Sequence, residues 1–220
     1  MCARVEEKIP NSRCLFLNGA EGNLVVVDRT GLVVPGNRYQ KAMAHGIKIA
    51  DEALSMYENA PSTSVAGLIT AQDFVSVKTK RDPSKAKESA EIIAKFQKEG
   101  LWSLHPVRAM CGRTIARAKI LDRLEQWGVD KMDLPISALF FCGVALVGIP
   151  GEPFSPVGEQ VRVRSGFPVT CMCCLTNGNF GYFPMAGDYD DGGYEAAGAY
   201  VVRGGAELLV EAASKLLARL

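Results

Sequence analysis

The sequence predicts an α/β domain in which a mixed β-sheet is flanked by helices, as a single domain covering residues 1–220. Segments with helical apolar spacing alternate with short apolar runs that are typical of strands. Late in the chain, two such runs are separated by a single glycine, as in a hairpin, which favours a mixed sheet over a purely parallel one. The length of 220 residues suffices for one large domain or two small ones.

The first quarter of the chain predicts two short strands and one long helix. The run "CLFL" at Cys14–Leu17 predicts a buried strand that ends in the turn sequence "NGAEGN", and "LVVVD" at Leu24–Asp28 predicts a second. Asn37–Tyr57 predicts a helix, because its apolar residues recur at spacings of four and three and form one face packed on a core. That face consists of Met43, Ile47, Ala50, Leu54 and Tyr57.

The middle of the chain predicts one strand and two helices. Gly67–Lys80 alternates between two faces, as in a strand that is either straight or interrupted by a bulge. A charged helix is predicted from near Pro83 to Gly100, and another from His105-Pro106 to about Trp127. Their charged residues are most simply solvent-exposed, whereas the second helix also carries an apolar stripe. That stripe consists of Ile115, Ala118, Leu121 and Leu124.

The last third of the chain predicts a hairpin, a further strand and a final helix. The runs "DLPISALFFCG" and "VALVGIPG" flank Gly143, which suggests a tight turn or a bulge. Phe167–Leu175 predicts a strand, and Thr176–Ala199 predicts a long, glycine-rich loop of the kind that is usually functional. Gly205–Leu220 predicts the final helix. Its apolar stripe consists of Leu208, Leu209, Ala212, Ala213, Leu216 and Leu217.

The composition excludes several classes of protein. A formal net charge of +1 gives no reason to expect nucleic acid or an anionic membrane surface as a partner. No apolar run reaches the roughly 18 residues of a transmembrane segment, and the first residues lack the apolar core of a secretion signal. The seven cysteines form no repeating framework, and several, such as Cys14 and Cys142, lie in strand-like apolar runs. Reduced thiols and a cytoplasmic location are therefore expected.

Other familiar sites find little support in the sequence. "TCMCCL" at Thr170–Leu175 offers two thiols on one strand face, half of a structural zinc site, so small apolar core residues are the simpler interpretation. His45 and His105 are more simply structural, and "DYDDGG" lacks the spacing of a calcium loop. The sequence contains no Walker motif, no G-x-S-x-G elbow and no dinucleotide fingerprint.

Glu152 is the first candidate for chemistry, and local sequence leaves two explanations for it. It follows the apolar strand that ends at Ile149 and stands beside Pro153, ahead of a helix-like stretch. An acid at that place can stabilise the first turn of a helix, or it can be a functional group on a loop held by a scaffold. The second candidate is the loop that carries Tyr182 and Tyr194, because a carboxylate and phenols in one cleft can hold a cation or position a substrate.

The chain resembles the neutral/alkaline non-lysosomal ceramidase family, especially its shorter bacterial members. The resemblance rests on P-G-E after an apolar strand in "GVALVGIPGEPFSPVGEQVRVRS", followed by N-x-x-x-G-Y and G-G-Y-E in "NGNFGYFPMAGDYDDGGYEAAGA". The upstream "CLFLNGAEGNLV" and the helix "YQKAMAHGIKIADEAL" occur in the family's order, so the likeness covers most of the chain. It implies the later part of a longer catalytic domain.

The resemblance implies a zinc-dependent amidase that cleaves the amide bond of an N-acyl sphingoid or another lipid-like substrate. Family members hold zinc with two histidines, a glutamate and a tyrosine. By motif position the glutamate corresponds to Glu152 and the tyrosine to Tyr182. Tyr194 would lie near the substrate as a catalytic and substrate-binding residue, and Asn177, which opens N-x-x-x-G-Y, would also bind substrate.

The sequence also departs from the family pattern. His45 and His105 do not stand in the family's histidine contexts, and the G-D-x-S of the glycine-rich turn reads Gly22, Asn23, Leu24, Val25 here, without the serine. The chain is therefore expected to be part of a longer polypeptide or a degenerate, non-catalytic member that acts in binding or assembly. In both cases we expect the isolated chain to bind zinc weakly or not at all. We also expect it to form a homo-oligomer through an uncovered apolar surface.

Overall fold

The computed structural model describes residues 1–24, 36–60, 67–100 and 112–220, which divide into two compact units. Unit 1 comprises Met1–Leu17 and Val25–Val65, and unit 2 comprises Asn18–Leu24 and Ala66–Leu220. Among the described helices, none combines the length and the apolar character that crossing a membrane requires.

Unit 1 is a pair of helices, α1 (Cys2–Lys8) and α2 (Arg38–Tyr57). The sequence explains where α2 begins, because Asn37 accepts hydrogen bonds from the backbone of Tyr39 and Gln40, and the Gln40 side chain returns a bond to the Asn37 backbone. This capping box satisfies donors that a helix start would otherwise leave unpaired. An ion pair between Arg4 and Asp51, 2.6 Å from nitrogen to oxygen, joins the two helices.

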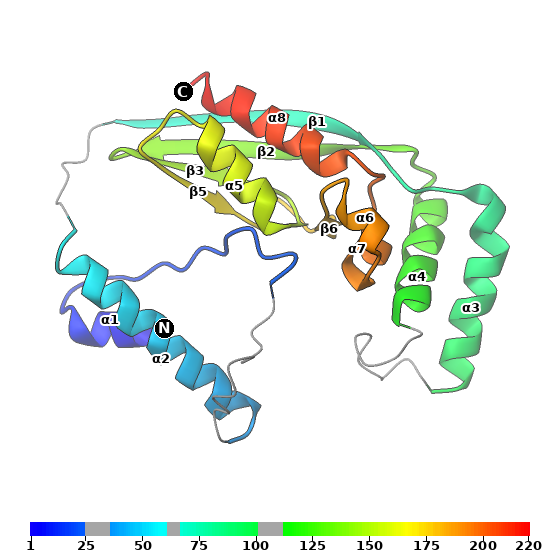
Figure 1. Ribbon diagram of the computed structural model, residues 1–220, viewed down its shortest axis with the longest axis horizontal. Coiled ribbons are helices and arrows are strands. Elements are labelled where there is room, and N and C mark those ends of the chain that lie inside the picture. The colour runs from blue at the N-terminus through cyan, green and yellow to red at the C-terminus, as the bar shows by residue number, and fades with distance from the viewer. Residues whose placement is uncertain (25–35, 61–66, 101–111) are drawn as a thin grey trace. The chain divides into compact units, whose positions relative to one another are not determined.

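Unit 2 is built on a four-stranded mixed sheet in the order β1-β2-β3-β5 (Figure 1). β1 pairs antiparallel with β2, β2 antiparallel with β3, and β3 parallel with β5. The strands are β1 (Leu68–Lys78), β2 (Lys131–Phe141), β3 (Val144–Gly148) and β5 (Val169–Cys173). The predicted α/β class with a mixed sheet is confirmed, whereas the boundaries of a single 1–220 domain stay a prediction.

The β2–β3 hairpin turns through two residues only. Both Cys142 and Gly143 have positive φ, 51° and 80°, as a two-residue hairpin loop of type I′ requires. The hairpin predicted around Gly143 is confirmed, but Cys142 belongs to the turn and not to a strand. The β1–β2 register is continuous from Leu68 to Lys78, so no bulge interrupts the pairing of β1 with β2.

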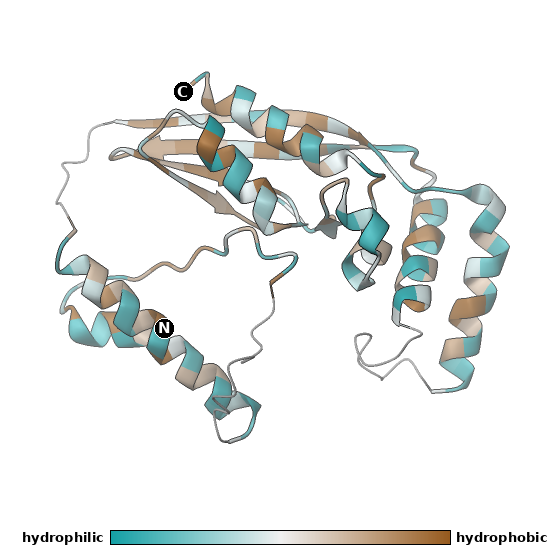
Figure 2. Cartoon of the chain, in the orientation of Figure 1, coloured by the Kyte–Doolittle hydropathy of each residue, from teal (hydrophilic) through white to brown (hydrophobic). Residues whose placement is uncertain are grey.

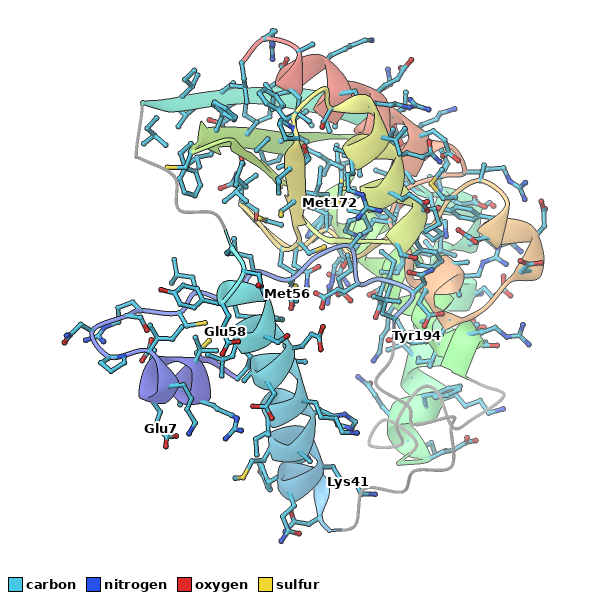
Figure 3. All side chains as sticks on the ribbon, turned by 60° about the vertical axis from the view of Figure 1, so that its left-hand side comes forward. Glu7, Lys41, Met56, Glu58, Met172 and Tyr194 are labelled. Carbon is cyan, nitrogen blue, oxygen red and sulfur yellow. The ribbon has the colours of Figure 1, made fainter. Side chains whose placement is uncertain are left out.

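Two helices pack on one face of this sheet, as Figure 1 shows. They are α5 (Ser155–Arg164) and α8 (Gly205–Leu217). Fully buried side chains such as Leu134 from β2, Val157 from α5 and Leu209 from α8 meet between the layers. Met172, on β5, belongs to the same core (Figure 3), and brown apolar residues mark these helices and strands in Figure 2. Burial of these apolar surfaces holds the two layers together.

The remaining elements of unit 2 are shorter or lie beside the sheet. The 3₁₀ turn at Pro83–Lys85 leads into α3 (Ala86–Lys98), which packs against α4 (Gly112–Trp127), and α4 packs in turn on α7 (Tyr194–Gly198). The other short elements are β4 (Glu152–Pro153), β6 (Tyr182–Phe183) and α6 (Asp188–Asp191).

Most helices predicted from apolar spacing are confirmed. Those near 37–57, 83–100 and 205–220 appear at nearly the expected positions, and the helix that ends at Trp127 is observed from Gly112. Its predicted start at His105 lies outside the described residues, as does most of the strand predicted at Leu24–Asp28. The stripe of α4 is buried as expected, whereas Leu208 in the stripe of α8 is 42% exposed.

Three expectations from the sequence are wrong. Cys14–Leu17 forms no strand, and Leu15 in it is 86% exposed, because an apolar run becomes a strand only when another strand pairs with it. The expected core face of α2 buries only Ala50, and Met43 is 67% exposed. The predicted loop Thr176–Ala199 contains β6, α6 and α7, because local contacts with neighbouring strands and helices order it.

Candidate functional site

The candidate site lies just beyond the carboxyl ends of the parallel strands β3 and β5. There the chain continues into β4, and Glu152 of β4 lies opposite Tyr182 of β6 in a short parallel ladder. Backbone bonds fix this position: the Glu152 amide donates to the Gly181 carbonyl (2.9 Å), and the Phe180 amide donates to the Pro150 carbonyl (3.0 Å). Groups placed beyond the carboxyl ends of parallel strands are typical of ligand sites in α/β sheets.

The glycine-rich turn "NGAEGN" lies against β4. The Gly22 amide donates to the Pro153 carbonyl (2.9 Å), and a Cβ at Gly22 would lie 2.2 Å from the Glu152 carbonyl oxygen. Only glycine permits so close an approach of two backbones. Asn23 accepts a hydrogen bond from the Ser155 amide (2.8 Å) and thereby caps α5 from a distant part of the chain. The capping explanation for Glu152 is therefore wrong, because Glu152 lies in β4 and Asn23 serves the helix start.

Two phenols accompany the carboxylate. The rings of Tyr182 and Tyr194 meet edge to face, with centroids 6.0 Å apart. Tyr194, labelled in Figure 3, begins α7, and Gly198 of the same helix lies against the Tyr182 ring. The Tyr182 hydroxyl also lies near enough to the Glu152 carboxylate for each group to shift the pKa of the other.

Burial and negative charge together shape the electrostatics of this group. Burial first, and the neighbouring Glu21 second, raise the pKa of Glu152, although the bond from Tyr182 partly opposes this. Burial, followed by the charge of Glu152, raises the pKa of Tyr182 to about 12. The pKa of Tyr194 is raised by burial and then by Glu195 and Glu152. Because each shift reflects unfavourable negative charge, the group would be stabilised by a cation or by a hydrogen-bond acceptor on a substrate.

The structure brings together three of the four predicted site residues. Glu152, Tyr182 and Tyr194 form one group, which agrees with the expectation that Glu152 and Tyr182 approach each other. Asn177 has its amide turned toward β2, where it donates to the Ser137 hydroxyl (3.3 Å), and its backbone has a positive φ of 64°. The roles assigned to these four residues in metal or substrate binding stay predictions.

Metal ligands are few in the described part of the chain, where no three His, Cys, Asp or Glu side chains converge. The structure places His45 within α2 of unit 1, and His105 lies outside the described residues. Cys174 is buried, where its thiol donates to the Gly19 carbonyl and burial raises its pKa to about 11. Cys171, by contrast, is exposed, because it lies on the face of β5 that points away from the helices. The interpretation of the cysteine cluster as core residues is therefore wrong for Cys171.

Sequence reasoning missed two contributors to the site. Glu21 acts on the pKa of Glu152, and its carboxylate accepts a bond from the Asn18 amide (3.0 Å). Asn23 holds the start of α5. The sequence shows an acid and two amides within a glycine-rich turn, which is typical of a turn that contacts other segments. Only the packing of that turn against β4 shows which residues Glu21 and Asn23 contact.

Neither a comparison with protein-family models nor one with curated proteins finds a match. Among solved structures, the neutral ceramidase from Pseudomonas aeruginosa superimposes over 100% of this chain with a TM-score of 0.61 and 14% sequence identity. A ceramidase complexed with C2 covers 40% of this chain and 14% of its own, at 18% identity, but its TM-score of 0.33 is too low to carry an argument. The chain spans 40% of the length of the Pseudomonas enzyme. This chain therefore shares the fold of part of a neutral ceramidase.

Proposed function

We propose that the chain takes part in hydrolysis of an amide bond in a lipid-like N-acyl substrate. One observation carries the proposal: Glu152, Tyr182 and Tyr194 form a half-buried group beyond β3 and β5, in a chain with the fold of part of a neutral ceramidase. Tyr194 keeps its proton at neutral pH, because the ordinary pKa of a tyrosine is about 10 and burial raises the pKa of Tyr194 further. Its hydroxyl can therefore donate a hydrogen bond to the negative charge that develops on the substrate oxygen.

Zinc is the cofactor that the resemblance implies, and the described residues fit it only in part. The Glu152 carboxylate and the Tyr182 hydroxyl are oxygen donors that lie side by side. A zinc site in a hydrolase has three protein ligands and an open position, usually with imidazole nitrogens. Two oxygen donors fall short of that number, so the described residues do not complete a zinc site of this kind. Weak zinc binding by the 220-residue chain remains the expectation.

The first prediction concerns activity. We expect the 220-residue chain, with zinc added, to release fatty acid from a fluorescent N-acyl sphingosine, and we expect Glu152→Gln to lower the rate at least about tenfold. The reason is that glutamine keeps the size of the side chain but removes the negative charge that lies beside Tyr182 and Tyr194. Steady-state fluorescence with and without zinc measures the effect.

The matched control for this experiment is Glu159→Gln, which makes the same change on an exposed part of α5. Unchanged activity in this control and loss in Glu152→Gln would support the proposal. Equal rates in the wild type and Glu152→Gln would refute the role of Glu152. No turnover by the wild type, with a folded chain and zinc present, would replace hydrolysis with the non-catalytic alternative.

One observation favours that second candidate, a protein that acts in binding or assembly. The face of the sheet opposite α5 and α8 carries a row of apolar residues that pair across the strands. The row runs from β1 to β5 and consists of Leu68, Phe141, Val144 and Val169. Leu68 in this row is 66% exposed and Val169 is 48% exposed. Phe74, on the same face but outside the row, is 62% exposed. Apolar surface of this kind is typical of interfaces.

The second prediction therefore concerns self-association. We expect light scattering at micromolar concentration to show a homodimer, because an interface on this face can bury the area of roughly 1,000 Å² that specific association requires. Leu68→Lys together with Phe74→Lys should give a monomer. The control is Leu208→Lys, at a partly exposed position of α8 on the other face of the sheet, and it should leave the dimer intact. A wild-type monomer throughout this range would contradict the prediction.

A further inference from the structure

A second region of unit 2 is arranged to receive a ligand. A cavity of about 710 Å³ lies between the end of β1, helix α4 and the segment that carries α6 and α7. Glu152, Tyr182 and Tyr194 are not among its lining residues. α7 separates the two regions, since Tyr194 at its start faces Tyr182, while Ala196 and Ala197 line the cavity.

The lining of this cavity is strongly basic. Five of its sixteen residues are lysine or arginine and one is an acid. The acid, Asp82, is held by hydrogen bonds from the amide and hydroxyl of Ser84, and its single charge leaves the lining with a net charge of +4. One of the cations, Arg81, is neutralised by ion pairs with Glu125 and Asp130. The other four are Lys78, Lys80, Arg113 and Arg117.

Lys80 is the least exposed of the four cations. Its ammonium donates to the Ala196 carbonyl (2.5 Å) and lies 4.9 Å from the centre of the Tyr189 ring. Burial first, and the positive charge of Arg117 second, lower the pKa of Lys80 to about 8. In the part of the chain that the structure describes, the charge that acts on Lys80 is thus another cation, and no carboxylate relieves it.

Arg113 and Arg117 approach from α4. They stand one helical turn apart and both are exposed. The Arg113 guanidinium lies beside the α6–α7 segment, because a Cβ built at Gly192 would be in van der Waals contact with it at 3.5 Å. Within the described residues, no carboxylate forms an ion pair with either arginine. Lys80, Arg113 and Arg117 therefore face one cavity, and none of the three forms an ion pair with a described carboxylate.

We propose that this cavity binds a small phosphorylated ligand whose phosphate lies between Lys80, Arg113 and Arg117. A phosphate offers several acceptor oxygens and up to two negative charges, which suit two guanidinium forks and one ammonium better than a single carboxylate does. The non-phosphate part of the ligand would lie against the apolar side of the cavity, formed by Ile120, Leu121 and the Tyr189 ring. The volume exceeds what phosphate alone requires, which favours a phosphomonoester over the free ion.

The proposal predicts saturable binding of phosphate by the full 220-residue chain. Inorganic phosphate and glycerol phosphate, titrated at constant ionic strength, should raise the melting temperature in a saturable manner, because a ligand that binds only the folded state stabilises it. Isothermal titration calorimetry should show one equivalent of either ligand bound per chain. Arg113→Gln with Arg117→Gln should weaken binding at least about tenfold, since each lost charge-assisted bond is worth at least about 1.4 kcal/mol.

The control is Arg162→Gln, which removes an exposed arginine from α5 and should leave phosphate binding unchanged. Both arginines of the double variant are exposed, so its melting temperature without phosphate should stay near that of the wild type. Sedimentation with vesicles that contain phosphatidic acid distinguishes a lipid headgroup from a soluble ligand. If the wild-type chain sediments with these vesicles and the double variant does not, the phosphate belongs to a lipid headgroup. An equal phosphate effect in the double variant, or an equal effect of chloride, would overturn the proposal.

Discussion

Replacing Gly22 with alanine is expected to lower the free energy of unfolding by about 3 kcal/mol, the upper part of the range for overpacking a close contact. The added Cβ would lie 2.2 Å from the Glu152 carbonyl oxygen and 2.9 Å from the carbonyl carbon. These are backbone atoms held by the β4–β6 ladder, so they cannot turn aside as a flexible side chain could. The turn and β4 must separate, and the bond from the Gly22 amide to Pro153 is lost with them.

Gly19→Ala is the control for this experiment, because it makes the same change in the same turn where a Cβ would meet nothing within 4 Å. Its effect should stay within about 0.5 kcal/mol. Urea unfolding followed by tryptophan fluorescence compares the two variants. Similar midpoints for Gly22→Ala and Gly19→Ala would show that the turn does not rest on β4 as described. If the turn does rest there, Gly22→Ala should also impair any activity that depends on Glu152.

Replacing Leu134 with alanine is expected to destabilise the protein by about 3 kcal/mol, or roughly 150-fold in the folding equilibrium. Leu134 lies in the first half of β2, is 0% exposed and belongs to the core between the sheet and the helices. Truncation removes several methyl groups and leaves a cavity, since the sheet on one side and the packed helices on the other limit relaxation.

Leu68→Ala makes the same substitution on the neighbouring strand, where the side chain is 66% exposed, and should change the stability of the monomer by about 0.5 kcal/mol or less. The measurement is again the urea midpoint, at a concentration low enough to avoid self-association. A cost for Leu68→Ala as large as that for Leu134→Ala would mean that the opposite face of the sheet is covered in solution. Such a result would support the assembly alternative.

Local chemistry explains why much of the secondary structure was predictable. The start of α2 is determined by Asn37 and Gln40, which lie three residues apart, and the β2–β3 hairpin by a two-residue turn. The stripe of α4 could be read directly from its spacing, because residues three or four apart share a helix face. Periodicity failed for α2, whose apolar face is mostly exposed, since a stripe shows which residues can be buried but not what covers them.

The candidate site was partly predictable for a similar reason. Glu152 and Tyr182 each follow a strand and belong to short motifs, so the sequence could nominate them and Tyr194. It could not show that Asn177 turns toward Ser137, because the two residues are 40 positions apart and their contact depends on the sheet. The role of Asn23 at the start of α5 spans 132 positions and was hidden for the same reason.

The sequence by itself determined the α/β class, the positions of most helices, the hairpin and the residues that nominate the Glu152 site, because these depend on neighbours along the chain. Only the tertiary structure decided which side of each element is buried, that the turn at Gly22 rests on β4, and that Lys80, Arg113 and Arg117 face one cavity. Contacts between residues far apart in sequence are set by how the layers pack, and packing depends on shape and burial across the whole unit.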